Sequence, residues 1–386
     1  MFTRPALSRL LPGILLSTTI SILAYRRRSL SRSGIAGAIV TGTTTFGLGG
    51  WTWGLSLIFF FISSSLLSHF RAPAKAHTAA DKFSKGGQRD IAQVAANGGM
   101  ATLLALGYGL SSSCPLQLFF RAGYVGALAT ATADTWATEL GVLSPLPPRL
   151  ITSGKVVAPG TSGGITLLGT GTGTLGALAL GLVFWLLELG GKMLASNTHQ
   201  PTKKEERGQR HVHGDRVGAG VGLRGVGALV AARWSGMSQA FLPGQKGDDG
   251  RPQGPLTCPP DRVLHIRYLS PRQGATPAPT RLPGRSFRSM HVGCKTLNSL
   301  PLLALISGFI GNLTDSLLGA TFQAMYYCPT CEKETERSIH NCGTRTRPLR
   351  GLAWLNNDAV NFMATLCGAL TAMGLHLVVM QGTKRS

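Results

Sequence analysis

Eight apolar stretches of nearly bilayer-spanning length constrain this chain more than any other feature of its sequence. A helix needs roughly 20 predominantly apolar residues to cross a membrane, and only 14% of the 386 residues are charged. The stretches cover residues 7–25, 34–50, 51–69, 91–110, 118–143, 164–189, 297–325 and 355–380. The sequence therefore predicts an all-α fold, a polytopic transmembrane helical bundle of about eight helices.

Basic residues are concentrated between these stretches. The formal net charge is +22, and excess Lys and Arg in a membrane protein usually mark loops kept on the cytoplasmic side. If each stretch crosses the membrane once, the loops 26–32, 71–89, 144–163 and 326–352 share one face. We assign this basic face to the cytosol or, in a plastid, to the stroma, and expect no nucleic-acid partner.

Residues 196–292 interrupt the helical pattern. This segment is rich in Gly, Pro, Arg and Gln and has no sustained apolar period, a composition typical of disorder. We predict a long disordered basic loop that divides the chain. Residues 1–195 then contain the first six helices, and residues 293–386 contain the last two helices and a Cys/His loop at 328–342.

Three acids, Asp134, Glu139 and Asp315, lie inside otherwise apolar stretches. Acids in membrane segments are costly and usually functional. Asp134 and Glu139 lie about 140° apart on a straight helix, so a helix break or a metal bridging two helices is needed to bring them together. Carboxylates suit Mg²⁺, which predicts metal-assisted chemistry. Ion or proton translocation and pairing with basic side chains are the alternatives.

Two loops on the basic face combine cations with glycine. Lys85 and Arg89 flank two glycines in the first loop, and Lys155 lies among Gly, Ser and Thr in the second, residues 152–164. Such groups can hold phosphate oxygens through charge and backbone N–H groups. The structural alternatives are a positive-inside loop and an ordinary turn.

Amide side chains recur on the helices that border this face. Gln93 and Asn97 follow the first loop, and Asn357 and Asn361 open the final helix. Residues four apart share one face of a helix, and the shared face of Asn357 and Asn361 would point into the bundle. Helix capping is the structural alternative.

Three cysteines and a histidine cluster in the loop at 328–342. Cys328 and Cys331 form a Cys-x-x-Cys pair, and His340 and Cys342 follow. Zinc prefers four ligands of this kind, although the spacing is compressed compared with common zinc fingers. A redox pair and unlinked thiols are the alternatives to structural Zn²⁺.

Four ordered segments resemble the integral membrane family that includes plant phytyl-phosphate kinase and transmembrane protein 19. They are residues 85–90 with Gln93 and Asn97, then 133–141, 315–323 and 357–361. The Asp-Thr-x-Ala-x-x-x-Gly element at 134–141 is also similar, more distantly, to the acidic motif of CTP-using polyprenol kinases and cytidylyltransferases.

The resemblance implies transfer of a phosphoryl group from CTP or another nucleoside triphosphate to an isoprenyl phosphate such as phytyl phosphate, for tocopherol synthesis. The implied partners are membrane lipid, the isoprenyl phosphate and the nucleotide. The implied location is the chloroplast envelope in a photosynthetic organism, and otherwise an internal membrane or the plasma membrane. The two competing classes are an ion or small-solute transporter and a CTP-dependent cytidylyltransferase of lipid phosphates.

On that resemblance, three groups of residues receive roles. The catalytic, Mg²⁺-binding acids are Asp134, Glu139 and Asp315; the phosphate-binding cations are Lys85, Arg89 and Lys155; the orienting amides are Asn97, Asn357 and Asn361.

Overall fold

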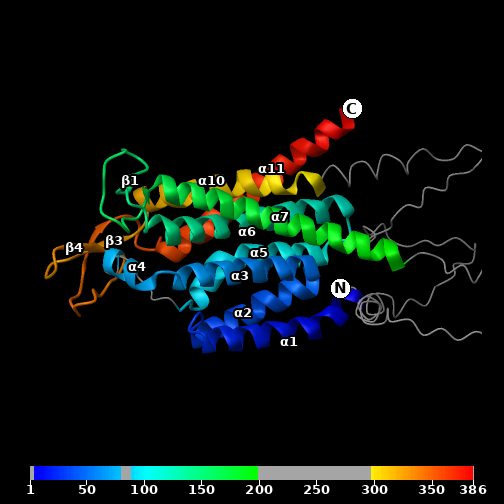
Figure 1. Ribbon diagram of the computed structural model, residues 1–386, viewed down its shortest axis with the longest axis horizontal. Coiled ribbons are helices and arrows are strands. Elements are labelled where there is room, and N and C mark those ends of the chain that lie inside the picture. Colours follow the sequence, from blue (N-terminus) through cyan, green and yellow to red (C-terminus); the bar gives the residue numbers. More distant parts are fainter. Residues whose placement is uncertain (1–3, 80–87, 199–296, 386) are drawn as a thin grey trace, which may run out of the picture. The chain divides into compact units, whose positions relative to one another are not determined.

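A computed structural model describes residues 4–79, 88–198 and 297–385 of the chain, and a helix forms at each predicted stretch. The α-helices are α1 (Arg4–Arg26), α2 (Arg32–Thr44), α3 (Trp51–His69), α4 (Ala72–Ala79), α5 (Ile91–Leu110), α6 (Cys114–Gly141), α7 (Leu167–Thr198), α10 (Leu300–Thr321) and α11 (Asn357–Arg385), and a short π-helix, η1 (Thr45–Gly49), extends α2 (Figure 1). The predicted helical membrane fold is confirmed. Of the predicted disordered loop at 196–292, residues 196–198 continue α7, and the rest lies outside the described residues.

Within the described residues, four helices are long and apolar enough to cross a membrane. They are Trp51–His69, Leu167–Leu194, Leu300–Thr321 and Asn357–Gln381. The remaining predicted stretches form helices as well, but α2 has only 13 residues and α6 is rich in Ala, Gly and Thr. Small and polar residues lower the hydropathy of a helix that is surrounded by other helices rather than by lipid.

Helix α6 is the centre of the compact unit formed by Met1–Trp185 and Pro283–Ser386. It contacts α3, α5, α10 and α11, and every residue from Ala122 to Ala133 is buried. The second unit, Leu186–Leu282, has the C-terminal part of α7 as its described portion.

Glycine lets the other helices approach α6 closely. A Cβ atom on Gly126 would collide with the carbonyl oxygen of Gly368 on α11, and one on Gly311 of α10 would collide with Thr130. Thr130 Oγ1 also donates a hydrogen bond to the Ser307 carbonyl at 3.2 Å. Close backbone contact of this kind is how small residues stabilise membrane helix pairs.

Two small antiparallel sheets, absent from the all-α prediction, lie in the loops. Strands β1 (Arg149–Leu150) and β2 (Gly164–Ile165) pair after α6. Strands β3 (Met325–Cys328), β4 (Lys333–Thr335) and β5 (Arg347–Arg350) form a sheet of order β4-β3-β5 after α10. Strands of two to four residues are too short to show an alternating pattern in the sequence.

The described parts of the four basic loops lie toward one end of the bundle, as their predicted common face requires (Figure 1, left). The backbone of Arg89 pairs with the loop after α1, its N–H group donating to the Ser29 carbonyl at 3.0 Å. Farther along the chain, Ser162 donates to Gln323 at 2.7 Å. Loops that are distant in the sequence therefore contribute to one surface.

Candidate functional site

A pocket of about 150 Å³ opens at this loop end, between α6, α7, α10 and the loop at 144–166. Each of the three helices supplies side chains spaced three and four residues apart, which places them on one face. The lining residues are Asp134, Ala137, Thr138 and Gly141 of α6, Asn312, Asp315 and Ser316 of α10, and Thr166, Gly169 and Thr170 at the start of α7.

Asp134 and Asp315 meet in this pocket. Their carboxyl groups lie close enough for each to influence the charge of the other. Asn361, oriented with its amide nitrogen toward Asp315, donates to Asp315 Oδ1 at 2.9 Å and to the Asn357 carbonyl at 3.2 Å. The structure thus joins two predicted acids and one predicted amide from three different helices.

Asn312 and Asn357 complete the amide lining. Asn312 is 5% exposed, and both side chains line the pocket. The cap of α11 is the neighbouring residue, Asn356, whose Oδ1 accepts from the Ala359 N–H at 3.0 Å. Because Asn356 does the capping, the side chain of Asn357 is left to line the pocket, and Asn361 contacts Asp315.

A chain of polar contacts adds a third acid, Glu336. Ser162 Oγ donates to Gln323 Oε1 at 2.7 Å, and Gln323 Nε2 donates to Glu336 Oε1 at 2.8 Å. Gln323 is 1% exposed, and Glu336 lines the pocket near enough to Asp315 to repel its charge. The sequence analysis missed Glu336 because only the β3–β4 fold brings this loop residue to the membrane acids.

The N-terminus of α7 lies at the pocket. Thr166 caps α7, since its Oγ1 accepts from the Gly169 N–H at 2.9 Å, and the N-terminus of a helix favours anions. Pro159, Gly160 and Thr161 of the preceding loop also line the pocket. The loop at 152–164, where we predicted that phosphate binds, therefore borders the pocket.

The predicted phosphate-binding cations lie elsewhere in the described structure. Lys155 is exposed at the tip of the β1–β2 loop, and Lys85 lies outside the described residues. Within the described part of the chain, no Lys or Arg lines the pocket. Its charged groups are acids.

Glu139 does not join the other two acids, a correction to the predicted set of three. Its carboxylate accepts from Lys75 Nζ and from Ser68 Oγ, both at 2.6 Å. Arg89 lies alongside, donating to Ser65 Oγ at 3.0 Å. Burial lowers the pKa of Arg89, and the nearby Glu139 carboxylate partly offsets this effect. Because α6 continues as a helix through Glu139, the angle of about 140° between the two acids persists.

The amides on α5 serve their own helix. Asp90 caps α5, and the Gln93 side chain closes a capping box with it. Asn97 Nδ2 donates to the Gln93 carbonyl at 3.1 Å. Neither amide lines the pocket. For Asn97, the structure shows a contact within its helix and not the predicted orienting role.

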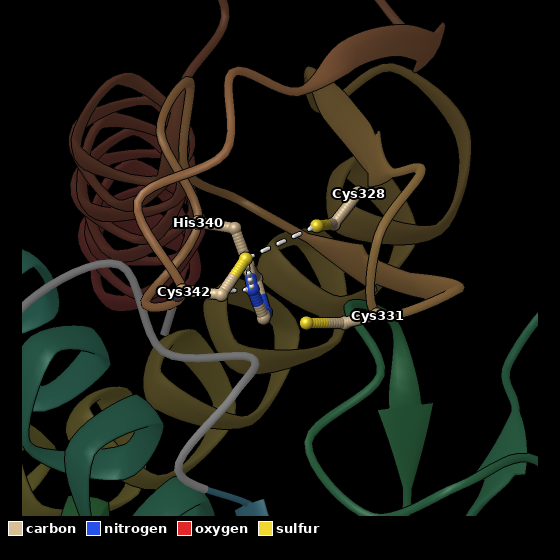
Figure 2. Close-up of side chains that lie close together, drawn as sticks. All are labelled: Cys328, Cys331, His340 and Cys342. Carbon is tan, nitrogen blue, oxygen red and sulfur yellow. Dashed lines mark hydrogen bonds between the residues drawn. The ribbon is translucent and has the colours of Figure 1, made fainter.

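The predicted Cys/His cluster forms at the turns of the small sheet (Figure 2). The ligand atoms of Cys328, Cys331, His340 and Cys342 all lie within 4.8 Å of one another. Hydrogen bonds with Thr344 and His340 lower the pKa of Cys342 to about 6. Such an environment favours a thiolate, the form that binds metal ions.

Curated relatives share part of this chain. Protein PGR of Arabidopsis thaliana is 34% identical over 192 residues, which cover 47% of this chain and 66% of the relative. An uncharacterized membrane protein of Methanocaldococcus jannaschii is 34% identical over 189 residues, 48% of this chain and 74% of the relative. Protein VTE6, chloroplastic, of Arabidopsis thaliana is 30% identical over 156 residues, 40% of this chain and 46% of the relative.

These alignments cover less than half of the chain, and the matched region spans just under two thirds of Protein PGR. No solved structure gave a significant match. The model of a family described as "Integral membrane protein DUF92" matches residues 15–230 and 285–369, well over half of the chain, and both acids of the pocket lie inside the matched parts. The chain therefore belongs to the DUF92 family of integral membrane proteins.

Proposed function

We propose that the chain is a membrane-bound prenyl-phosphate kinase that converts phytyl phosphate to phytyl diphosphate at the expense of a nucleoside triphosphate. The observation that carries the proposal is the pairing of Asp134 and Asp315 in a pocket at the loop end of the bundle. The family resemblance supplies the reaction class, and Protein VTE6, chloroplastic, is a relative whose name places it in the chloroplast.

The donor set of the pocket fits Mg²⁺. This ion prefers carboxylate and carbonyl oxygens and keeps several waters, and the pocket offers Asp134, Asp315 and the amide oxygen of Asn312. When bound, Mg²⁺ would neutralise charge on the phosphates during transfer. Asn361 fixes the orientation of Asp315 through its hydrogen bond. Glu139, held by Lys75, has a structural role in this proposal.

The start of α7 and the loop before it are suited to the phosphates. The dipole of a helix favours anions at its N-terminus, and Thr166, Gly169 and Thr170 line the pocket at that end of α7. In the proposed reaction, an anionic oxygen of the prenyl phosphate forms a new P–O bond to the γ-phosphorus as the bond to the nucleoside diphosphate breaks. The acceptor oxygen is already anionic, so the site needs no base to deprotonate it.

Apolar side chains beside the pocket are exposed where a prenyl chain would lie. Leu167 of α7 is 86% exposed, Leu317 of α10 is 48% exposed, and Phe322 is 53% exposed. Each is adjacent in sequence to a pocket-lining residue. A substrate with a polar head and an apolar tail can therefore place its head in the pocket and its tail along the lipid-facing surface.

A specific observation also favours a transporter. Asp134 and Asp315 lie in a pocket whose described lining contains no Lys or Arg, and they resemble the intramembrane acids of ion and proton pathways. In that case purified protein in vesicles would move ions without consuming a nucleotide, which separates the two functions experimentally.

The test is conversion of labelled phytyl phosphate by membranes that contain the chain, with CTP, ATP and Mg²⁺ supplied separately. We expect phytyl diphosphate and a nucleoside diphosphate from wild-type protein and from Glu334→Gln, an exposed acid of β4, but not from Asp134→Asn. Release of pyrophosphate would indicate a cytidylyltransferase instead. Absence of product with every donor, from inserted and monodisperse protein, would refute the kinase proposal.

A further inference from the structure

We infer that Cys328, Cys331, His340 and Cys342 bind one structural Zn²⁺, and that this ion holds Glu336 in place at the pocket. The inference does not depend on the proposed reaction, because metal content is measured without any substrate.

The distances in the cluster match a zinc site and exclude a disulfide. Ligand sulfurs lie about 2.3 Å from tetrahedral zinc, which places two of them about 3.8 Å apart. Cys328 Sγ and Cys342 Sγ are 3.6 Å apart, and His340 Nδ1 is 3.2 Å from Cys342 Sγ. A disulfide would need about 2.05 Å between sulfurs, and all three cysteines are free. Within the described residues, this is the group of His, Cys, Asp or Glu with the mutual spacing of metal ligands.

Two tight turns present the ligands in pairs. Cys328 ends β3 and Cys331 lies in the turn to β4, while His340 and Cys342 lie in a second turn closed by the Gly343 N–H donating to the His340 carbonyl at 2.9 Å. Gly343 has a φ of +82°, a conformation that glycine adopts without strain. Two facing turns that each carry two ligands are a common way to build a tetrahedral site.

An independent observation points to a ligand at this position. His340 is 5% exposed, and its Nε2 is buried with no hydrogen-bond partner. Burying an unpaired polar atom is costly, so an imidazole is expected here only if its ring is otherwise engaged. Figure 2 shows this ring directed among the three sulfur atoms. Binding a metal through the imidazole would account for its burial.

The small sheet has little else to hold it together. Of the residues in Met325–Arg350, only Met325, Cys328, Thr335 and His340 are buried, and two of these belong to the cluster. Units below about 40 residues usually need a metal, a disulfide or a partner to fold stably. The cluster is therefore the main interaction that stabilises this segment from within.

The position of Glu336 depends on the Cys/His cluster through the β3–β4 hairpin. It follows β4, whose Thr335 pairs with Tyr326 of β3, and its carboxylate accepts from Gln323 just before β3. The metal cluster lies at the opposite end of the β3–β4 hairpin, where Cys328 pairs with Lys333. Loss of the metal would free the hairpin and with it the acid that faces Asp315.

The test uses the full chain with a tag that contains no histidine, purified in detergent without chelators. We expect about one zinc ion per chain by mass spectrometry of the metals, retained in Cys367→Ser, whose sulfur lies on α11, and lost in Cys331→Ser. Cys342→His, which keeps a zinc ligand, should retain the ion. Refilling with Co²⁺ should give the visible absorption of tetrahedral cobalt–thiolate coordination.

A second measurement separates metal loss from general unfolding. Trypsin should cut wild-type protein slowly at the exposed Arg345, and Cys331→Ser or chelated wild-type protein much faster, with the helical bundle left intact. Wild-type protein that neither contains zinc nor takes up cobalt would overturn the inference. Equal zinc content in Cys331→Ser and Cys367→Ser would overturn it as well.

Discussion

Lys75 Nζ lies 2.6 Å from Glu139 Oε2, and this salt bridge gives the two acids of α6 different surroundings. Asp134 lines the pocket, while Glu139 ties α6 to α4. The side chains are 9% and 22% exposed, so the pair is largely shielded from water.

Removing one partner of this pair should destabilise the protein. We expect Glu139→Gln or Lys75→Met to lower the free energy of unfolding by about 2–4 kcal/mol, because a buried charge loses its partner. The double variant should lose less than the sum of the single ones, which a double-mutant cycle of thermal unfolding in detergent would measure. Strict additivity would mean that the two charges do not interact.

Asp134→Asn and Asp315→Asn should each lower the rate of product formation by about 100-fold or more, since a group that stabilises transition-state charge contributes about 3 kcal/mol. Glu139→Gln, once stabilised by low temperature, should keep most of its activity per folded molecule. The measurement is the initial rate, corrected for monodisperse protein. An equal loss of initial rate in all three variants would indicate that Glu139 also takes part in the reaction.

Gly163→Ala should be far more damaging than Gly154→Ala. Both positions have positive φ, +79° and +67°, so each alanine costs about 1–2 kcal/mol of backbone strain. A Cβ on Gly163 would also collide with Ala320 of α10, whereas nothing lies within 4 Å of a Cβ on Gly154. Because the backbone strain is similar in the two variants, any difference in their thermal unfolding temperature or activity reports the collision with Ala320. Similar values for both variants would argue against this packing.

Gln323→Leu should impair activity while leaving the fold and the zinc content unchanged. The side chain links Ser162 to Glu336, and a hydrogen bond to a charged group is worth about 1.5–3 kcal/mol, so we expect at least about a tenfold loss. Thr321→Val is the control, because its hydroxyl bonds only to the Leu317 carbonyl in its own helix. A loss of zinc in Gln323→Leu would show that the sheet, and not the polar link, had been disturbed.

The helices and one acid pair follow from the sequence for simple physical reasons. Apolar stretches of sufficient length predict membrane helices wherever they occur, and Asp134 and Asp315 stand out because acids are so costly in such a setting. The partner of Glu139 could not be predicted, since Lys75 lies 64 positions away. Glu336 lies in a loop rich in charged residues, where the presence of an acid does not indicate a functional role.

The cations illustrate the same limit. Lys155 and Arg89 are of a residue type that binds phosphate, but whether they reach a pocket depends on loop geometry that hydropathy does not describe. Arg89 donates a hydrogen bond to Ser65 and lies near the Glu139 carboxylate. Lys155 is exposed at the tip of the β1–β2 loop. The Cys/His cluster could be found from spacing alone because its four ligands lie within one short loop.

The contact between Trp185 and Asn298 has a consequence for how this chain tolerates change. Trp185 Nε1 donates to Asn298 Oδ1 at 3.4 Å, and Gly181 packs against Pro301. The interior of α7 is thus already joined to the chain at the start of α10. Because loop-closure entropy grows only slowly with loop length, changes in length between these two joined points should cost little stability, and the family match breaks off between residues 230 and 285.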